Sequence, residues 1–274
     1  MIRPATILVA NDHAASRYTV VRYLRHAGYQ VIEASDGIEA VARAAELPDL
    51  IILDVNMPGK DGYEVCDILR QDPKTRGIPV IMLTAIHKDD TNRIRGFEHG
   101  AVAYLTWPVE PTVLAAQTAA VLEAHSHEQR LSRWVTRCTP LAGEAFYRAA
   151  VTFLAEELGV DLALIGRVEE TPPTRVRVLA ARIAGELKPP FEYALAGTPC
   201  ADVAEKGFCL HPDGACERFP EDHALIDLGA RSYAGMPLRD RDGRLIGIIA
   251  VAARMPITQP TIVEGLLRLV ADRA

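Results

Sequence analysis

The segment Leu50–Gly62 constrains the fold of this chain more than any other. A continuous apolar run ends in a single carboxylate, Asp54, and a turn rich in glycine with one proline follows it. An apolar run bounded by turn residues is typical of a buried parallel strand. Ligands bind at the carboxyl ends of such strands in open α/β sheets. Asp54 is therefore a candidate for chemistry at a sheet edge, although a capping or turn aspartate would have the same local sequence.

The first half of the chain alternates apolar runs with amphipathic stretches. Strictly alternating strands and helices predict an α/β fold with a doubly wound, five-stranded parallel sheet and helices on both faces. Right-handed crossovers would bring Asp12, Asp54, Thr84 and Trp107 to one edge. The expected strands are Thr6–Ala10, Gln30–Glu33, Leu50–Leu53, Val80–Leu83 and Ala101–Leu105, and the expected helices are Ala15–Ala27, Gly37–Ala45, Tyr63–Arg70, Asn92–His99 and Thr112–Ala124.

This arrangement resembles the receiver (CheY-like) domain of two-component response regulators, which has a flavodoxin-like fold. The resemblance implies that Asp54 accepts a phosphoryl group from a histidine kinase. It implies that Mg²⁺ binds Asp12, Asp54 and the backbone carbonyl of Asn56. It also implies that Thr84 and Tyr104 switch the shape of the domain, and that the peptide bond before Pro108 is cis.

The residue types suit this chemistry. A carboxylate nucleophile can accept a phosphoryl group as an acyl phosphate. Phosphoryl transfer depends mostly on positioning and on charge neutralisation, so a hard divalent cation must offset the clustered oxygens. A hydroxyl group can then donate a hydrogen bond to the added phosphoryl group, and this local contact can change the conformation of the domain.

Two positions depart from the family pattern. Asn11 takes the first position of the acidic pair, so one negative charge near the metal is missing. Trp107 stands before Pro108 where the family has a lysine, and it cannot supply an ammonium group. The nearest cations in the sequence are Lys60 and Lys88, on neighbouring loops. Two interpretations stay open: a phosphorylatable receiver with altered switching, or a degenerate receiver that acts through protein contacts alone.

Length and composition indicate a signalling protein of two domains. The chain has 274 residues, enough for two separate cores, and its net charge of −6 argues against a general nucleic-acid surface. No apolar run approaches transmembrane length, and no charged-then-apolar leader precedes the first strand. We therefore expect a cytoplasmic protein with reduced thiols, which are Cys66, Cys138, Cys200, Cys209 and Cys216.

A helical connector, residues 126–138, is expected to continue the last helix of the receiver, residues 1–125. No proline or glycine occurs from Thr112 to Arg137, which predicts one long helix or two helices broken near Ser126. An apolar stripe on this helix is interrupted by polar residues, so a homodimer interface and packing on its own domains are both open. The stripe consists of Val113, Gln117, Ala120, Ala124, His127, Leu131 and Trp134.

Residues 139–274 predict an α+β domain with an antiparallel sheet and an irregular middle segment over one sheet face. Asp242 and Gly243 lie between two alternating apolar runs, which is a hairpin signal. The expected helices are Glu144–Leu158 and Thr261–Arg273, and the expected strands are Asp161–Val168, Arg175–Ala184, Ser232–Leu238 and Arg244–Ala252.

This second half resembles a GAF domain, which implies a sensor or dimerisation module with a pocket between the sheet and the irregular segment. The resemblance is carried by Leu158–Asp161, Ala196–Cys200, Phe208–Gly214, Leu228–Leu238 and Asp242–Gly247. Candidates for the pocket lining are Cys200, Phe208, Cys209, His211 and Tyr233, whose aromatic members could equally belong to the core.

The sequence leaves the ligand of the GAF domain unknown. The set Cys209, His211, Cys216 and His223 has suitable atoms for zinc, but its spacing matches no compact zinc motif. Redox sensing by the thiols of the irregular segment stays open, with Arg218 the one nearby cation.

No catalytic output signature is visible, so we do not expect an enzyme. Helix-turn-helix, histidine-kinase and nucleotide-cyclase motifs are not seen. Either output runs through protein contacts, or this is the N-terminal part of a longer histidine kinase or cyclase that continues from the last amphipathic helix.

Overall fold

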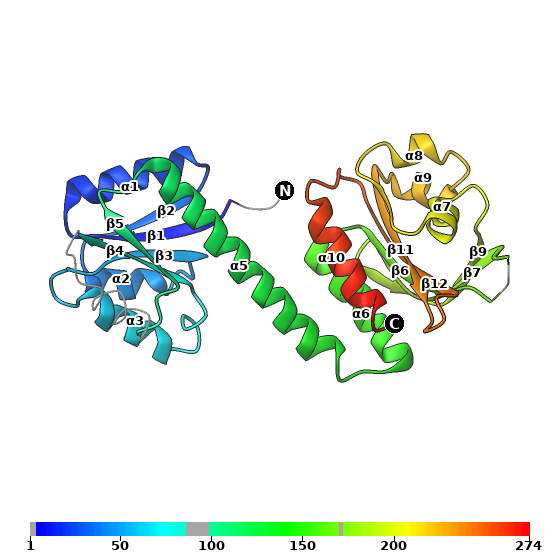
Figure 1. Ribbon diagram of the computed structural model, residues 1–274, viewed down its shortest axis with the longest axis horizontal. Coiled ribbons are helices and arrows are strands. Elements are labelled where there is room, and N and C mark those ends of the chain that lie inside the picture. Colours follow the sequence, from blue (N-terminus) through cyan, green and yellow to red (C-terminus); the bar gives the residue numbers. More distant parts are fainter. Residues whose placement is uncertain (1–3, 86–98, 170–171) are drawn as a thin grey trace. The chain divides into compact units, whose positions relative to one another are not determined.

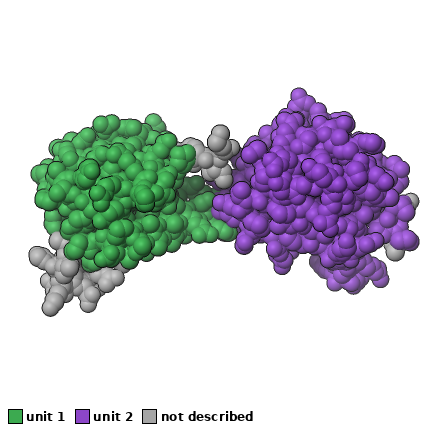
Figure 2. Space-filling view, turned by 90° about the horizontal axis from the view of Figure 1, so that it is seen from above, with its two compact units in different colours: residues 1–129 green, residues 130–274 purple. Residues whose placement is uncertain are grey.

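The computed structural model describes residues 4–85, 99–169 and 172–274. The chain divides into two compact units, Met1–Gln129 and Arg130–Ala274 (Figures 1 and 2). Each unit has its own sheet and its own hydrophobic clusters. Within the described residues, no helix combines the length and apolar character that crossing a bilayer would require.

The first unit is built on a parallel sheet with the strand order β2-β1-β3-β4-β5. The predicted α/β fold is therefore confirmed, and β3 lies in the middle of the sheet. The strands are β1 (Thr6–Ala10), β2 (Gln30–Ala34), β3 (Leu50–Asp54), β4 (Val80–Ala85) and β5 (Ala103–Trp107).

Helices cover both faces of this sheet, as Figure 1 shows. One apolar cluster joins the sheet to α2 and α3, and another joins it to α1 and the start of α5. The bounds are α1 (Ala14–His26), α2 (Gly37–Ala44), α3 (Gly62–Gln71) and α5 (Pro111–Cys138). Most of the helix predicted at Asn92–His99 lies outside the described residues.

Local sequence explains where the helices begin. Asp36 caps α2 by accepting the N–H of Glu39 at 2.8 Å. Asp61 and Glu64 form a reciprocal capping box at the start of α3. Such caps satisfy the unpaired N–H groups of the first helical turn.

The helix α5 is continuous, which decides between the two predictions for this segment. Its first half contributes Leu114 to the core of the first unit, and its last turns contribute Trp134 and Cys138 to the core of the second. Leu131 and Val135 are exposed. The predicted stripe therefore does not form one continuous face, because Trp134 is buried against its own unit.

The second unit has an antiparallel sheet with the order β10-β11-β12-β6-β7-β8, in which β9 also pairs with β7. The predicted α+β domain is confirmed. The strands are β6 (Leu162–Arg167), β7 (Arg175–Ile183), β8 (Glu186–Lys188), β9 (Phe191–Ala194), β10 (Cys209–His211), β11 (Ser232–Arg239) and β12 (Leu245–Ala253).

Two helical layers enclose this sheet (Figure 1). The long helices α6 and α10 pack on one face, together with the end of α5. The short helices α7, α8 and α9 form a lobe over the opposite face. The bounds are α6 (Gly143–Leu158), α7 (Pro199–Lys206), α8 (Ala215–Arg218), α9 (His223–Leu228) and α10 (Pro260–Ala271).

Replacing Trp134 should destabilise the second unit. Its ring is 4% exposed and lies 5.2 Å from Phe153 and 6.0 Å from Phe146, between ring centroids. Trp134→Ala should lower the free energy of unfolding of this unit by about 3–5 kcal/mol, because it leaves a large cavity. Val135→Ala is the matched control, since Val135 is 56% exposed. Calorimetry of the full chain should show a lower melting temperature only for Trp134→Ala; equal melting temperatures would contradict this packing.

Gly62 should resist replacement because it lies against the backbone of the β3–α3 turn. A Cβ atom there would lie 2.5 Å from the carbonyl oxygen of Asp54 and 3.0 Å from the Cα of Val55. Gly62→Ala should therefore destabilise the first unit by about 1–3 kcal/mol. Gly77→Ala is the control, since no atom lies within 4 Å of its added Cβ. Hydrogen exchange in β3, read by mass spectrometry, should accelerate only in Gly62→Ala.

Candidate functional site

The predicted site residues of the first unit gather at the carboxyl edge of the sheet. Strand pairing sets Ala10 beside Leu53 and Asp54 beside Leu83. The loop after β1, the end of β3 and the end of β4 therefore reach the same edge. Thr84 follows one residue further along β4.

Asp54 is half-buried at the end of β3, and its surroundings oppose its charge. Burial is the main cause that raises the pKa of the Asp54 carboxyl, and the nearby carboxylate of Asp12 raises it further. The backbone N–H of Asn56 donates to Asp54 Oδ1 at 3.3 Å and lowers the pKa, as does the imidazole of His13. The site therefore brings two carboxylates together and leaves negative charge to be neutralised.

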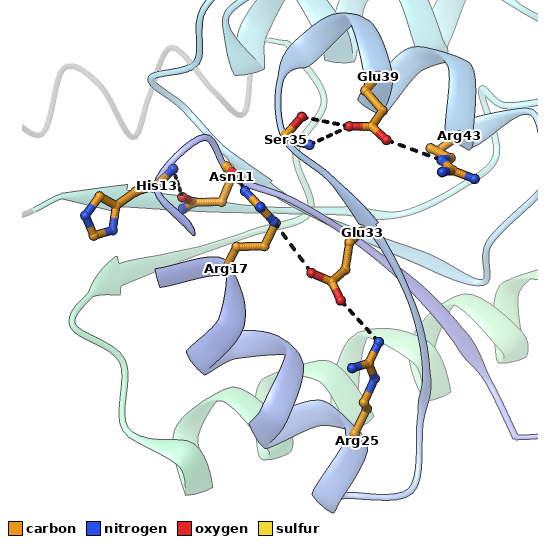
Figure 3. Close-up of polar contacts among 8 residues, drawn as sticks. All are labelled: Asn11, His13, Arg17, Arg25, Glu33, Ser35, Glu39 and Arg43. Carbon is orange, nitrogen blue, oxygen red and sulfur yellow. Dashed lines mark hydrogen bonds and ion pairs between the residues drawn. The ribbon is translucent and has the colours of Figure 1, made fainter. Parts of the chain in front are cut away.

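Asn11 is buried, and its side chain is engaged locally. Its Oδ1 accepts the N–H of His13 at 2.8 Å, at the entrance to α1. Its backbone carbonyl accepts Arg17 Nη1 at 2.6 Å. Figure 3 shows Arg17 reaching on to Glu33, which Arg25 also approaches. The amide that replaces an acidic residue therefore helps to fix the loop that carries Asp12.

The side chain of Trp107 packs against the apolar cluster beneath α1 and α5. The side chain is partly buried there and contributes no charge to the carboxyl edge. The peptide bond between Trp107 and Pro108 is cis, as the resemblance implied. Lys60 lies half-buried in the turn after β3, and Lys88 lies outside the described residues.

Tyr104 lies on the other face of β5, in the cluster beneath α2 and α3. Its hydroxyl donates to Met82 Sδ at 2.9 Å, and burial raises the pKa of the phenol. Thr84 is half-buried at the end of the neighbouring strand. The two residues expected to act as switches therefore occupy adjacent strands, β4 and β5.

The donor chemistry of this edge fits Mg²⁺. Asp12 and Asp54 supply two carboxylates whose charges interact, and the backbone of Asn56, two residues after Asp54, contributes a carbonyl oxygen of the kind that Mg²⁺ binds. Mg²⁺ takes one or two carboxylates and retains several waters. Among the described residues, no set of three or more His, Cys, Asp or Glu side chains is arranged as a metal site.

In the second unit, Cys200 lies at the centre of a buried polar cluster beneath the lobe. Tyr193 donates its hydroxyl to Cys200 Sγ at 3.0 Å, and the hydroxyl of Tyr233 lies 3.1 Å from the same sulfur. Burial raises the pKa of all three groups. A raised thiol pKa means little thiolate at neutral pH, so Cys200 has the character of a structural residue.

His211 and Cys209 also face the lobe, from the edge strand β10. The His211 ring lies 5.2 Å from Phe219 and 6.2 Å from Tyr233, between ring centroids. Burial lowers the pKa of His211, and its Nε2 is buried with no hydrogen-bond partner among the described residues. Cys209 is partly exposed beside this histidine.

The structure corrects one of the pocket candidates. Phe208 packs with α6 and α10 on the face opposite the lobe, together with Leu210. Side chains alternate between the two faces of a strand, so Phe208 and Cys209 cannot line the same pocket. The other candidates, Cys200, Cys209, His211 and Tyr233, all lie on the lobe face.

Sequence reasoning missed two polar residues of the lobe, Tyr193 and Asp222. Tyr193 lies on the short strand β9, whose alternating sequence was the signal that could have found it. Asp222 caps α9 by accepting the N–H of Leu225 at 3.1 Å, and burial raises the pKa of its carboxyl. The charge of Asp222 in turn helps to raise the pKa of Cys200.

Comparison with known proteins matches the two units separately. The model of the response regulator receiver domain matches residues 7–119, and the model of the GAF domain matches residues 143–274. The chain is 43% identical over 118 residues to the response regulator PleD of Caulobacter vibrioides, covering 43% of this chain and 26% of PleD. It is 38% identical over 149 residues to the DNA-binding dual master transcriptional regulator RpaA of Synechocystis, covering 52% of this chain and 61% of RpaA.

A solved structure of similar sequence is the signal receiver domain of a signal transduction histidine kinase from Syntrophus aciditrophicus. It is 37% identical, covers 44% of this chain and 91% of that chain, and has a TM-score of 0.40. The chain spans less than two thirds of the length of PleD and of RpaA. Residues 7–119 therefore belong to the receiver domains of two-component response regulators, and residues 143–274 belong to the GAF domains.

Proposed function

We propose that this chain is a two-component signalling regulator whose receiver domain is phosphorylated on Asp54 by a sensor histidine kinase. The observation that carries the proposal is the pair of interacting carboxylates, Asp12 and Asp54, at the carboxyl edge of the parallel sheet. The N–H of Asn56 and the hydroxyl residue Thr84 lie at the same edge.

In the proposed reaction, a carboxylate oxygen of Asp54 attacks phosphorus and an acyl phosphate forms. The bond from phosphorus to the kinase imidazole breaks, and the imidazole leaves with its electron pair and takes up a proton. Asp12, Asp54 and the Asn56 carbonyl would hold Mg²⁺, which would offset the charge of the phosphoryl oxygens. The N–H of Asn56 already donates to the carboxyl group of Asp54 and keeps the nucleophile oriented.

Thr84 and Tyr104 would then respond to the phosphoryl group by a change of contacts. A hydroxyl at the end of β4 can donate to a phosphoryl oxygen, and movement of β4 would change the contact between Met82 and Tyr104. The GAF domain would act as the second sensor or as a dimerisation module, connected through α5. Self-association through α5 stays a prediction.

A degenerate receiver is the second candidate function. It is favoured by the uncharged residue Trp107 at the end of β5, which leaves the carboxyl edge without a cation from this strand. In this case Asp54 takes no phosphoryl group, and the receiver serves as a protein-interaction module beside a ligand- or redox-sensing GAF domain.

Exposure to acetyl phosphate with Mg²⁺ distinguishes the two candidates. The intact mass of the wild type should increase by one phosphoryl group, and that of Asp54→Asn should not. Chelation of Mg²⁺ should prevent the increase. A second assay should test transfer of the phosphoryl group from a phosphorylated histidine kinase. If the mass of the wild type is unchanged both with acetyl phosphate and with the kinase, the degenerate receiver is favoured.

Thiol labelling tests redox sensing by the GAF domain. Cys200 is 4% exposed, and burial raises the pKa of Cys66 to about 12 and of Cys138 to about 11. These thiols should resist a water-soluble disulfide reagent at neutral pH and react only in denaturant, because both the thiolate and access are lacking. Cys209 and Cys216 are partly exposed and should react first. Peptide mass analysis after timed exposure gives the order, and early reaction of Cys200 would favour redox sensing.

A further inference from the structure

We propose that His13 binds the phosphoryl group on Asp54, by donating a hydrogen bond from its Nε2–H to a phosphoryl oxygen. The inference rests on the proposed phosphorylation of Asp54 and adds a residue from the β1–α1 loop to that site. His13 would replace, as a hydrogen-bond donor, the cation that β5 does not supply. The bond between Asp54 and phosphorus is unaffected by this role.

The position of His13 places it at the right edge of the sheet. It directly follows Asp12 in the loop after β1, and β1 pairs with the Asp54 strand through Ala10 and Leu53. His13 is exposed, so an incoming phosphodonor could reach it. In its protonated form the imidazole is close enough to lower the pKa of the Asp54 carboxyl, and that form carries a proton on Nε2 just as the neutral Nε2–H tautomer does.

The hydrogen bonds of His13 fix which nitrogen carries the proton. His13 caps α1, and its Nδ1 accepts the backbone N–H of Ser16 at 3.3 Å. The hydroxyl of Ser16 lies 2.9 Å from the same nitrogen. A nitrogen that accepts an N–H has its lone pair engaged, so the proton of the neutral ring is on Nε2. The helix cap therefore orients the ring and leaves the Nε2–H as a donor on the side of the ring away from Ser16.

Two other side chains near this edge of the sheet are already engaged elsewhere. Arg17 donates to the carbonyl of Asn11 and pairs with Glu33, and Trp107 is packed beneath α1 and α5. Figure 3 shows the ring of His13 turned away from Arg17 and Glu33. Within the described part of the chain, the hydrogen bonds of the His13 ring are those to Ser16 alone. Its Nε2–H is thus available to a ligand.

Two variants separate the donor from the helix cap. His13→Asn keeps a good N-cap but has no N–H at the distance of Nε2. His13→Gln loses the preferred cap but carries an amide N–H at about the reach of the ring nitrogen. If His13 is a donor, uptake of phosphate from acetyl phosphate with Mg²⁺ should slow by about tenfold in His13→Asn, and His13→Gln should recover most of the rate. A purely structural cap predicts the reverse order.

The control is His26→Asn, since His26 is an exposed histidine at the other end of α1. Rates come from the time course of intact mass, and melting temperatures show that each variant is folded. Equal rates in the wild type and His13→Asn would overturn the role of His13 while leaving the proposed function in place. A wild type that takes no phosphoryl group from acetyl phosphate or from a kinase would overturn the proposed function, and the role of His13 with it.

Discussion

The first unit depends on the burial of β3 between β1 and β4. Its four apolar residues are fully buried, with Ile51 and Leu53 in one cluster and Leu50 and Ile52 in the other. A strand that is apolar on both faces has no inward or outward side to fix its register. The polar ends fix it, because sliding the strand inward would bury the Asp54 carboxylate without compensation, at a cost of several kcal/mol. The same constraint leaves Asp54 half-buried and raises its pKa.

Hydrophobic periodicity was sufficient for the long elements and insufficient for the lobe of the GAF domain. The parallel strands β1, β3 and β4 are mostly apolar runs of five or six residues, and α6 has an apolar face over sixteen residues, so these elements could be found from the sequence. The strands β8 and β10 have three residues each, and α8 has four. Elements this short contain too little periodicity to be distinguished from loops. The mistake at Phe208 has another cause, since neighbouring residues were assigned to one pocket although strand geometry turns them to opposite faces.

The candidate site was predictable in its two carboxylates and in Thr84, but not in the polar residues of the loop after β1. Asp12, Asp54 and Thr84 could be located because the ends of parallel strands meet at one edge. The sequence also indicated that residue 107 is an uncharged tryptophan. It could not show that the ring packs against the apolar cluster beneath α1. The roles of His13 and Arg17 depend on the turn at Asn11, where a backbone N–H and a carbonyl are both used. Asn is a residue type that favours such a turn, but the sequence does not show which groups the turn will engage.

The helix α5 shows how the two domains can be coupled physically. Leu114 belongs to the cluster that also contains Trp107, and Trp134 belongs to the core of the GAF domain. The same continuous helix therefore contributes side chains to both cores. Coupling nevertheless requires an element with two discrete arrangements. Trp107 ends β5, the strand that also carries Tyr104, and packs against the cluster that contains Leu114 of α5, so the strand and the helix share one apolar contact region in the first unit.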